Sequence, residues 1–233
     1  MNHHLYPSWD ELNNQLVSCS LCPRLIAWSQ EVARIKRRAF RDWNYWGKPV
    51  PGFGDKKGRI LVIGLAPGAH GSNRTGRMFT GDSSGDFLYA ALHKNGFANQ
   101  AEAFSRDDGL ELNDIFITAV CRCAPPENKP LPEEIINCQP YLLSEINLLP
   151  TVDGIIALGN VAYQQIQRIF PIFGWQAPKL PFSHGGETIS MNGSPWVITS
   201  YHPSRQNTQT GRLTVGMFND IWIRAKEKLN QVE

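Results

Sequence analysis

Four short apolar runs place the strongest constraint on how this chain of 233 residues can fold. They are RILVIG at 59–64, DIFITAV at 114–120, DGIIALG at 153–159 and PWVITS at 195–200. Each run is continuous and rich in β-branched residues, which is typical of a strand buried on both faces. Segments with a helical pattern separate the runs, so we predict an α/β fold in which helices cover both faces of a parallel sheet.

Helix caps and chain breakers predict the remaining elements. Ser8 and Glu11 form a capping box for a first helix that runs to residue 19. Further helices are expected at 24–40, 83–96, 131–149, 160–170 and 212–229. Pro140 should break or kink the third of these. A short strand near residue 187 and a turn at Asn192 and Gly193 should lead into the last apolar run.

Composition and length indicate one ordinary globular domain. Hydrophobic residues make up 42% of the chain and charged residues 19%. No run approaches the roughly 18 apolar residues of a membrane span, and the start of the chain lacks the basic and apolar regions of a secretory signal. We therefore expect a cytoplasmic monomer with no membrane contact. A single domain over 1–233 is predicted, with residues 1–58 as a helical, basic extension packed on it.

The charge distribution is more informative than the net charge of +2. Between Arg24 and Arg59 there are ten Lys or Arg residues and three acids, with aromatic residues interleaved from Phe40 to Phe53. Two interpretations stay open, namely a solvated helix face beside a packed loop, and a patch that contacts phosphates.

In parallel sheets the functional site lies beyond the carboxyl ends of the strands. The loops after residues 63, 120, 158 and 200 should therefore converge. His202 follows the last strand almost directly, Pro203 fixes the exit direction, and the polar residues at 204–209 suit phosphates or a groove. This position favours a functional histidine over a structural one.

The loop GLAPGAHGSNRTGRMFTGD at 64–82 follows the first apolar run. Its glycine spacing does not fit a dinucleotide fingerprint, and in the P-loop frame Arg77 and Met78 replace the required Lys and Ser/Thr. The turn at 64–68 holds no acid, base or nucleophile. We therefore interpret it as a pocket wall whose backbone N–H groups face a flat polar ligand or an anion.

The five cysteines are suited to a metal centre. Cys19 and Cys22 form a CxxC pair, and with Cys138 and one of Cys121 or Cys123 they supply four thiolates for zinc or a [4Fe–4S] cluster. We expect only one of Cys121 and Cys123 to face the centre. The alternatives of zinc, iron and idle buried thiols stay open at this point.

Four segments together resemble the uracil-DNA glycosylase superfamily, most closely its family 5, the type b iron–sulfur glycosylases. They are CSLCPRL, the loop at 64–82, CRCAPPENKPLPEE with Cys138, and HPSRQNTQTGRLT, and they extend from Cys19 to Thr214. The resemblance implies a three-layer α/β/α sandwich with a central four-stranded parallel sheet. It also implies a monofunctional DNA glycosylase that flips uracil out of single- or double-stranded DNA and removes it in base excision repair.

The resemblance further implies a [4Fe–4S] cluster held by Cys19, Cys22, Cys123 and Cys138. Cys123 is the matching ligand because it directly precedes Ala124, and Cys121 is then a spare. The cluster would be structural and would bind the N-terminal extension to the rest of the domain.

The implied chemistry is distributed over several loops. Phe79 would stack on the flipped base, Asn128 would bind the base edge, and His202 would stabilise negative charge on O2. Asp82 would orient water or stabilise the sugar cation, with Asp86 as a weaker candidate. We expect the base pocket to comprise Gly64, Ala66, Gly68, His70, Phe79, Asn128 and His202. We expect DNA contacts from Arg74, Ser204, Arg205, Gln206 and Arg212.

Two positions of the turn depart from the relatives: one related family carries an Asp there and another a Glu, where this chain has Ala66 and Leu65. The turn cannot supply a general base, which fits a dissociative mechanism. The reduced crowding predicts a broad range of bases that includes hypoxanthine. It also keeps open an alternative, a non-catalytic damaged-DNA-binding protein of the same fold. A zinc-stabilised nucleotide-binding domain would need the phosphate motif that the spacing excludes.

Overall fold

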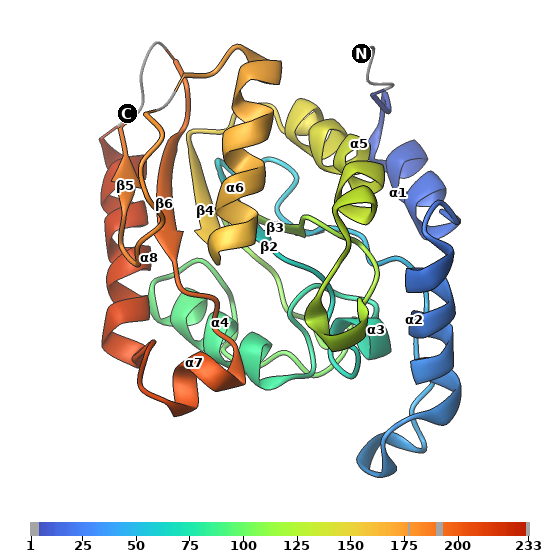
Figure 1. Ribbon diagram of the computed structural model, residues 1–233. Coiled ribbons are helices and arrows are strands. Elements are labelled where there is room, and N and C mark those ends of the chain that lie inside the picture. Colours follow the sequence, from blue (N-terminus) through green and yellow to red (C-terminus); the bar gives the residue numbers. More distant parts are fainter. Residues whose placement is uncertain (1–4, 177, 190–192, 232–233) are drawn as a thin grey trace.

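The computed structural model describes residues 5–176, 178–189 and 193–231 (Figure 1). The helices are α1 (Trp9–Val17), α2 (Pro23–Ile35), α3 (Ser72–Thr75), α4 (Ser83–Lys94), α5 (Pro132–Leu148), α6 (Asn160–Ile169), α7 (Arg205–Gln209) and α8 (Val215–Asn230). Short 3-10 turns are η1 (Arg38–Phe40), η2 (Pro126–Asn128) and η3 (Phe170–Phe173). The strands are β1 (Phe53–Gly54), β2 (Ile60–Gly64), β3 (Ile115–Ala119), β4 (Gly154–Leu158), β5 (Glu187–Thr188) and β6 (Trp196–Ser200).

The strands form one sheet in the order β1-β3-β2-β4-β6-β5. The four inner strands are parallel, with Val62 of β2 aligned with Ile117 of β3 and Ile156 of β4. All residues of these strands are buried, as their continuous apolar runs predict. The predicted four-stranded parallel sheet is confirmed. The two-residue strands β1 and β5 extend it as antiparallel edges, and β1 lies in a segment expected to be loop.

Helices cover both faces of the sheet, which confirms the three-layer α/β/α sandwich (Figure 1). Alternate residues of β2 point to opposite faces, so that Val62 packs in one core with α4 and α8, and Ile63 packs in the other with α5 and α6. Burial of both faces leaves polar side chains to the loops at the strand ends, where a ligand has access.

The N-terminal helices lie outside this sandwich. Ser8 caps α1 by accepting a hydrogen bond from the Glu11 N–H at 3.2 Å, and α1 packs against α5 through Leu12, Leu16 and Tyr141. Helix α2 ends at Ile35 and not near residue 40 as predicted, because Lys36 turns the chain with φ of 58°. The chain then forms η1, which projects at the lower right of Figure 1.

The remaining expectations have different outcomes. Pro140 does not break α5, which continues through it, and the kink stays a prediction. Proline has no N–H, so the carbonyl of Ile136, an exposed residue, loses its helical partner there. The predicted turn at Asn192 lies outside the described residues. No helix in the described ranges is long and apolar enough to cross a bilayer, while the cytoplasmic location and the monomeric state stay predictions.

Candidate active site and cysteine cavity

The carboxyl ends of the parallel strands bring separate loops to one edge of the sheet. β2 ends where the site loop, residues 64–82, begins, and β6 ends at Ser200, two residues before His202. The N–H of Gly159, directly after β4, donates to the Ser200 carbonyl at 2.8 Å. A Cβ on Gly159 would lie 3.5 Å from the Cβ of His202. The loops after β4 and β6 therefore meet at the predicted edge.

Asp82 ends the site loop and caps helix α4. Its Oδ1 accepts hydrogen bonds from the N–H groups of Ser84 at 3.0 Å and Gly85 at 3.1 Å. This is the arrangement of a helix N-cap, which favours a negative charge. Burial nevertheless raises the pKa of Asp82 above its usual range, while the two N–H groups oppose that rise. The carboxylate is thus both a structural cap and a partly desolvated acid.

The second carboxylate oxygen of Asp82 faces the glycines of the site loop. A Cβ on Gly71 would lie 1.9 Å from Oδ2, and a Cβ on Gly68 would lie 2.7 Å from it. Both distances are too short for a real carbon atom, so only glycine lets the loop pass this close. Within the described residues Oδ2 accepts no hydrogen bond. It is available to a water molecule or a ligand.

Phe79 and His202 lie face to face. Their ring centroids are 5.8 Å apart with an interplanar angle of 28°, although 122 positions separate them in the sequence. Phe79 has a positive φ of 51°, and a Cβ on Gly64 would lie 2.8 Å from its ring. The glycine at the end of β2 therefore makes room for the Phe79 ring, which is buried at the margin of the apolar core and packs next to the histidine.

His202 is held as a neutral imidazole. Removal from solvent lowers its pKa to about 4, so near pH 7 one ring nitrogen carries a proton and the other does not. The His202 carbonyl accepts a hydrogen bond from Asn207 Nδ2 at 2.9 Å, which fixes the backbone before α7. A neutral imidazole in this position can donate one hydrogen bond to a ligand.

The remaining predicted residues lie at different depths. Ala66 packs against the apolar core on the α5 side of the sheet. Asn128 is exposed in η2 with φ of 56°, and no hydrogen bond joins it to Asp82 or His202 in the described part of the chain. Arg205 and Gln206 are exposed in α7, which Ser204 caps. The guanidinium of Arg212, also exposed, lies 4.6 Å from the Tyr201 ring centroid.

The position of Arg74 contradicts the prediction that it contacts DNA. The residue is 3% exposed, and its guanidinium lies 4.0 Å from the ring centroids of both Phe40 and Trp43. Its Nε donates to the His70 carbonyl at 2.8 Å and its Nη2 donates to the Gly81 carbonyl at 2.7 Å. A guanidinium enclosed in this way holds the site loop together and does not reach a phosphate.

A tyrosine that sequence reasoning missed contacts the predicted pocket residue His70. The hydroxyl of Tyr45 lies 3.1 Å from His70 Nδ1. Tyr45, Phe40 and Trp43 all belong to the basic, aromatic segment noted in the sequence. The interleaved aromatics were therefore the signal, but their partners in the site loop could be found only from the structure.

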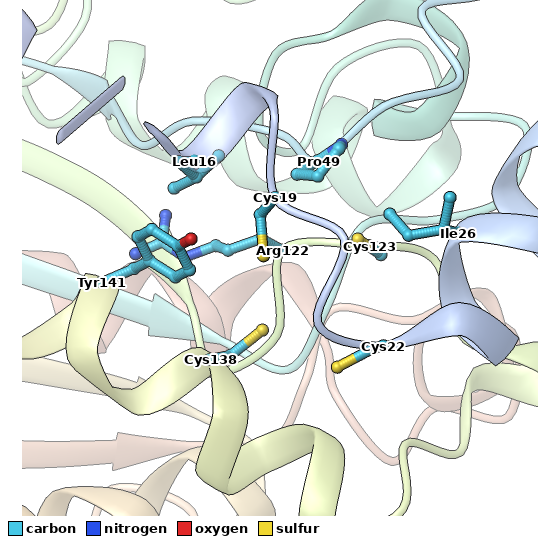
Figure 2. A pocket seen from close by; sticks show the side chains of 9 residues that line it. All are labelled: Leu16, Cys19, Cys22, Ile26, Pro49, Arg122, Cys123, Cys138 and Tyr141. Carbon is cyan, nitrogen blue, oxygen red and sulfur yellow. The ribbon is translucent and has the colours of Figure 1, made fainter. Parts of the chain in front are cut away.

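Four cysteines line one small cavity, and Figure 2 shows their sulfur atoms pointing into it. Cys19 follows α1, Cys22 directly precedes α2, Cys123 follows β3 and Cys138 lies in α5. The other lining residues are Leu16, Ile26, Pro49, Arg122 and Tyr141. Within the described ranges no three His, Cys, Asp or Glu side chains converge closely enough to hold a single metal ion.

Two thiols of this cavity, those of Cys22 and Cys123, are in an environment that disfavours the free thiolate. Burial raises the pKa of Cys22 and of Cys123, so cations would be needed to keep these sulfurs deprotonated. Asn137 Nδ2 lies 3.6 Å from the Cys22 sulfur and can donate to it. Cys121 does not line the cavity and packs in the apolar core, where it contacts Cys138. Strand alternation is not the reason, because residues two apart on an extended segment face the same side. The chain instead bends at Arg122 and Cys123, which separates the two thiols.

Comparison with known proteins gives a consistent result. The model of the Uracil DNA glycosylase superfamily matches residues 51–226. A type-5 uracil-DNA glycosylase of Thermus thermophilus is 50% identical over 211 residues, which are 91% of this chain and 94% of that protein. One of Mycobacterium tuberculosis is 50% identical over 93% of this chain and 80% of that protein. One of Pyrobaculum aerophilum is 42% identical over 93% of this chain and 92% of that protein.

The matched residues span the whole parallel sheet and include Asp82, Phe79 and His202. The similarity therefore covers both the sandwich and the edge of the sheet where these side chains gather. The chain belongs to the uracil-DNA glycosylase superfamily.

Proposed function

We propose that this protein is a monofunctional DNA glycosylase that hydrolyses the N-glycosidic bond of uracil in DNA. The observation that carries the proposal is the meeting of Asp82, Phe79 and His202 at one sheet edge, in a chain of this superfamily. Uracil in a duplex must leave the base stack to reach such an enclosed group of residues. The product, a base-free site in DNA, is the starting point of base excision repair.

Phe79 and His202 would act on the flipped base. The Phe79 ring offers an aromatic face for stacking, and Gly64 keeps the end of β2 clear of it. As the glycosidic bond breaks, its electron pair moves to the base and negative charge develops on O2. A neutral His202, whose pKa is about 4, can donate its N–H to that oxygen. Stabilising charge where it develops is a major source of enzymatic acceleration.

Asp82 would act on the sugar side. Its Oδ1 is used by the helix N-terminus, whereas Oδ2 stays available beside Gly68 and Gly71. The carboxylate can stabilise the positive sugar and accept a proton from the water that adds to C1′. Its raised pKa supports the second role. Leu65 and Ala66 supply no further carboxylate, so Asp82 carries this function alone in the site loop.

The range of bases and the DNA contacts extend this proposal. Because Leu65 and Ala66 replace charged residues, the pocket would accept larger bases, including hypoxanthine. Asn128 would bind the base edge once DNA is present, since its exposed loop follows the end of β3. The polar residues at the start of α7, together with Arg212, would contact the backbone of single- or double-stranded DNA.

A [4Fe–4S] cluster would fit the cysteine cavity. The donor set is purely thiol, which is what iron–sulfur clusters and zinc select. The sulfurs share a cavity but do not converge on one point, which favours a multi-atom cluster over a single ion. Cys19, Cys22, Cys123 and Cys138 would hold it. When bound, it would supply no redox step but would join the N-terminal helices to β3 and α5.

Single-turnover excision from uracil-containing DNA tests the function. Asp82→Asn retains a capping side chain and should slow excision by at least tenfold, whereas Asp86→Asn on the exposed first turn of α4 should have little effect. His202→Asn should slow excision by about 10² to 10³-fold, the usual cost of losing one charge-stabilising donor. If the wild-type protein binds uracil-containing DNA tightly but releases no base, the non-catalytic alternative is correct.

A further inference from the structure

The basic segment after α2 forms an arm at the edge of the sheet where the site lies. We define the arm as residues 36–48, which contain five Lys or Arg residues and one acid. In Figure 1 the arm projects below α2, on the same side as α3, α4 and α7. It therefore lies near the ends of the parallel strands and not at their beginnings.

Most cations of the arm are exposed to solvent. The exposed ones are Arg37, Arg38, Arg41 and Lys48. None of the four forms an ion pair with a described residue, in contrast to Arg24 and Arg34 of α2, which pair with Glu134 and Glu31. Unpaired cations on a surface attract anions and contribute little to stability. The arm is thus suited to an anionic partner.

Three sets of contacts hold the arm against the site loop. The rings of Phe40 and Trp43 enclose the guanidinium of Arg74. The backbone N–H of Trp46 donates to the Arg74 carbonyl at 2.9 Å, and the backbone N–H of Gly47 donates to the Asn73 carbonyl at 3.0 Å.

The third contact is the hydrogen bond between Tyr45 and His70. Burial lowers the pKa of His70, and the nearby charges of Arg37 and Arg74 lower it further. The arm cation Arg37 is therefore close to the loop that ends in Asp82.

We infer that the arm binds backbone phosphates of DNA beside the flipped nucleotide, and that Arg74 couples the position of the arm to the site loop. The inference rests on the proposed function, which puts DNA at this edge. Arg74 bridges the two parts through its Nη2 bond to Gly81, the residue directly before Asp82. Arg74 is a positioning residue, and the phosphate contacts come from Arg37, Arg38 and Arg41.

The test measures how the affinity for an undamaged, fluorescein-labelled duplex depends on salt. Each lost phosphate contact lowers the slope of log affinity against log salt by about 0.9. The variant R37Q/R38Q/R41Q should therefore lose up to about 2.7 of the wild-type slope. The matched control is K57Q/K94Q/R168Q, which removes three exposed cations that form no ion pair among the described residues, at the opposite edge of the sheet. It should retain the slope.

Arg74→Lys tests the coupling, because it keeps the charge but loses the planar contact with two rings and one of the two carbonyl bonds. It should keep the salt slope and should slow excision at saturating enzyme by tenfold or more. A folded Arg74→Lys protein with the wild-type excision rate would refute the coupling. An unchanged slope in the arm variant, with uracil still excised by the wild type, would refute the arm and leave the proposed function standing. A wild type that binds with the expected slope but excises nothing would refute the function alone.

Discussion

Gly71→Ala should impair excision through displacement of Asp82, without changing any chemical group of the site. The added Cβ would start 1.9 Å from Oδ2, and ordinary contact begins at 3.4 Å, so the carboxylate has to move by about 1.5 Å. A misplacement of about 1 Å can cost roughly 100-fold in rate, which corresponds to about 2.7 kcal/mol in the activation free energy. We expect a loss of at least that size.

Two further alanine variants test how the loss of rate depends on the size of the displacement of Asp82. Gly68→Ala starts at 2.7 Å from Oδ2 and requires a shift of about 0.7 Å, so it should cost roughly tenfold. Gly216→Ala adds a methyl group in α8 whose nearest neighbour is 3.9 Å away, and it should have no effect. The assay is single-turnover excision at saturating enzyme, well below the melting temperature of each variant. Equal rates for a folded Gly71→Ala protein and the wild type would show that the position of Asp82 does not limit the reaction.

Three other properties can be measured directly. His202 is neutral in the folded state, with a pKa of about 4 against 6.5 when unfolded. Between pH 6.5 and 4 the unfolded state binds a proton at His202 that the folded state does not, so the free energy of unfolding should fall as the pH falls through this interval. Urea unfolding of His202→Asn should therefore depend less on pH there. Asp108→Ala deprives the buried Arg77 guanidinium of the half-buried carboxylate that accepts its two hydrogen bonds, both 2.7 Å long, and should lower the free energy of unfolding by about 3 kcal/mol, the lower end of the cost of breaking a buried pair. Iron and sulfide analysis should find a cluster retained in Cys121→Ser and lost in Cys123→Ser, and the opposite result would exchange the two assignments.

The sequence predicted the sheet well because its four inner strands are buried on both faces, which leaves an unmistakable apolar run for each. His202 was selected from its position just after the last apolar run, whereas Phe79 and Asp82 were selected through the resemblance to the glycosylase superfamily. The edge strand β1 was not predicted, because a strand of two residues shows no periodic pattern. The end of α2 at Ile35 was not predicted either, because no glycine or proline marks it.

The roles of glycines and of Arg74 could not be read from the chain. Gly68 and Gly71 look like ordinary turn residues until the Asp82 carboxylate is seen beside them, 11 to 14 positions later in the sequence. Arg74 looks like a surface cation because its ring partners lie some 30 residues upstream. The roles of the two glycines and of Arg74 depend on contacts between segments distant in the sequence, and such contacts cannot be predicted from one sequence alone.

The cysteine cavity joins two segments that are made at very different times. Cys19 and Cys22 leave the ribosome more than 100 residues before Cys138, which at 5–20 residues per second is a delay of roughly 5 to 25 s. During that interval the first pair would have neither its partners nor the helix that covers it. Oxidants can then reach the CxxC pair most easily. We therefore expect protein produced under iron limitation to contain a Cys19–Cys22 disulfide.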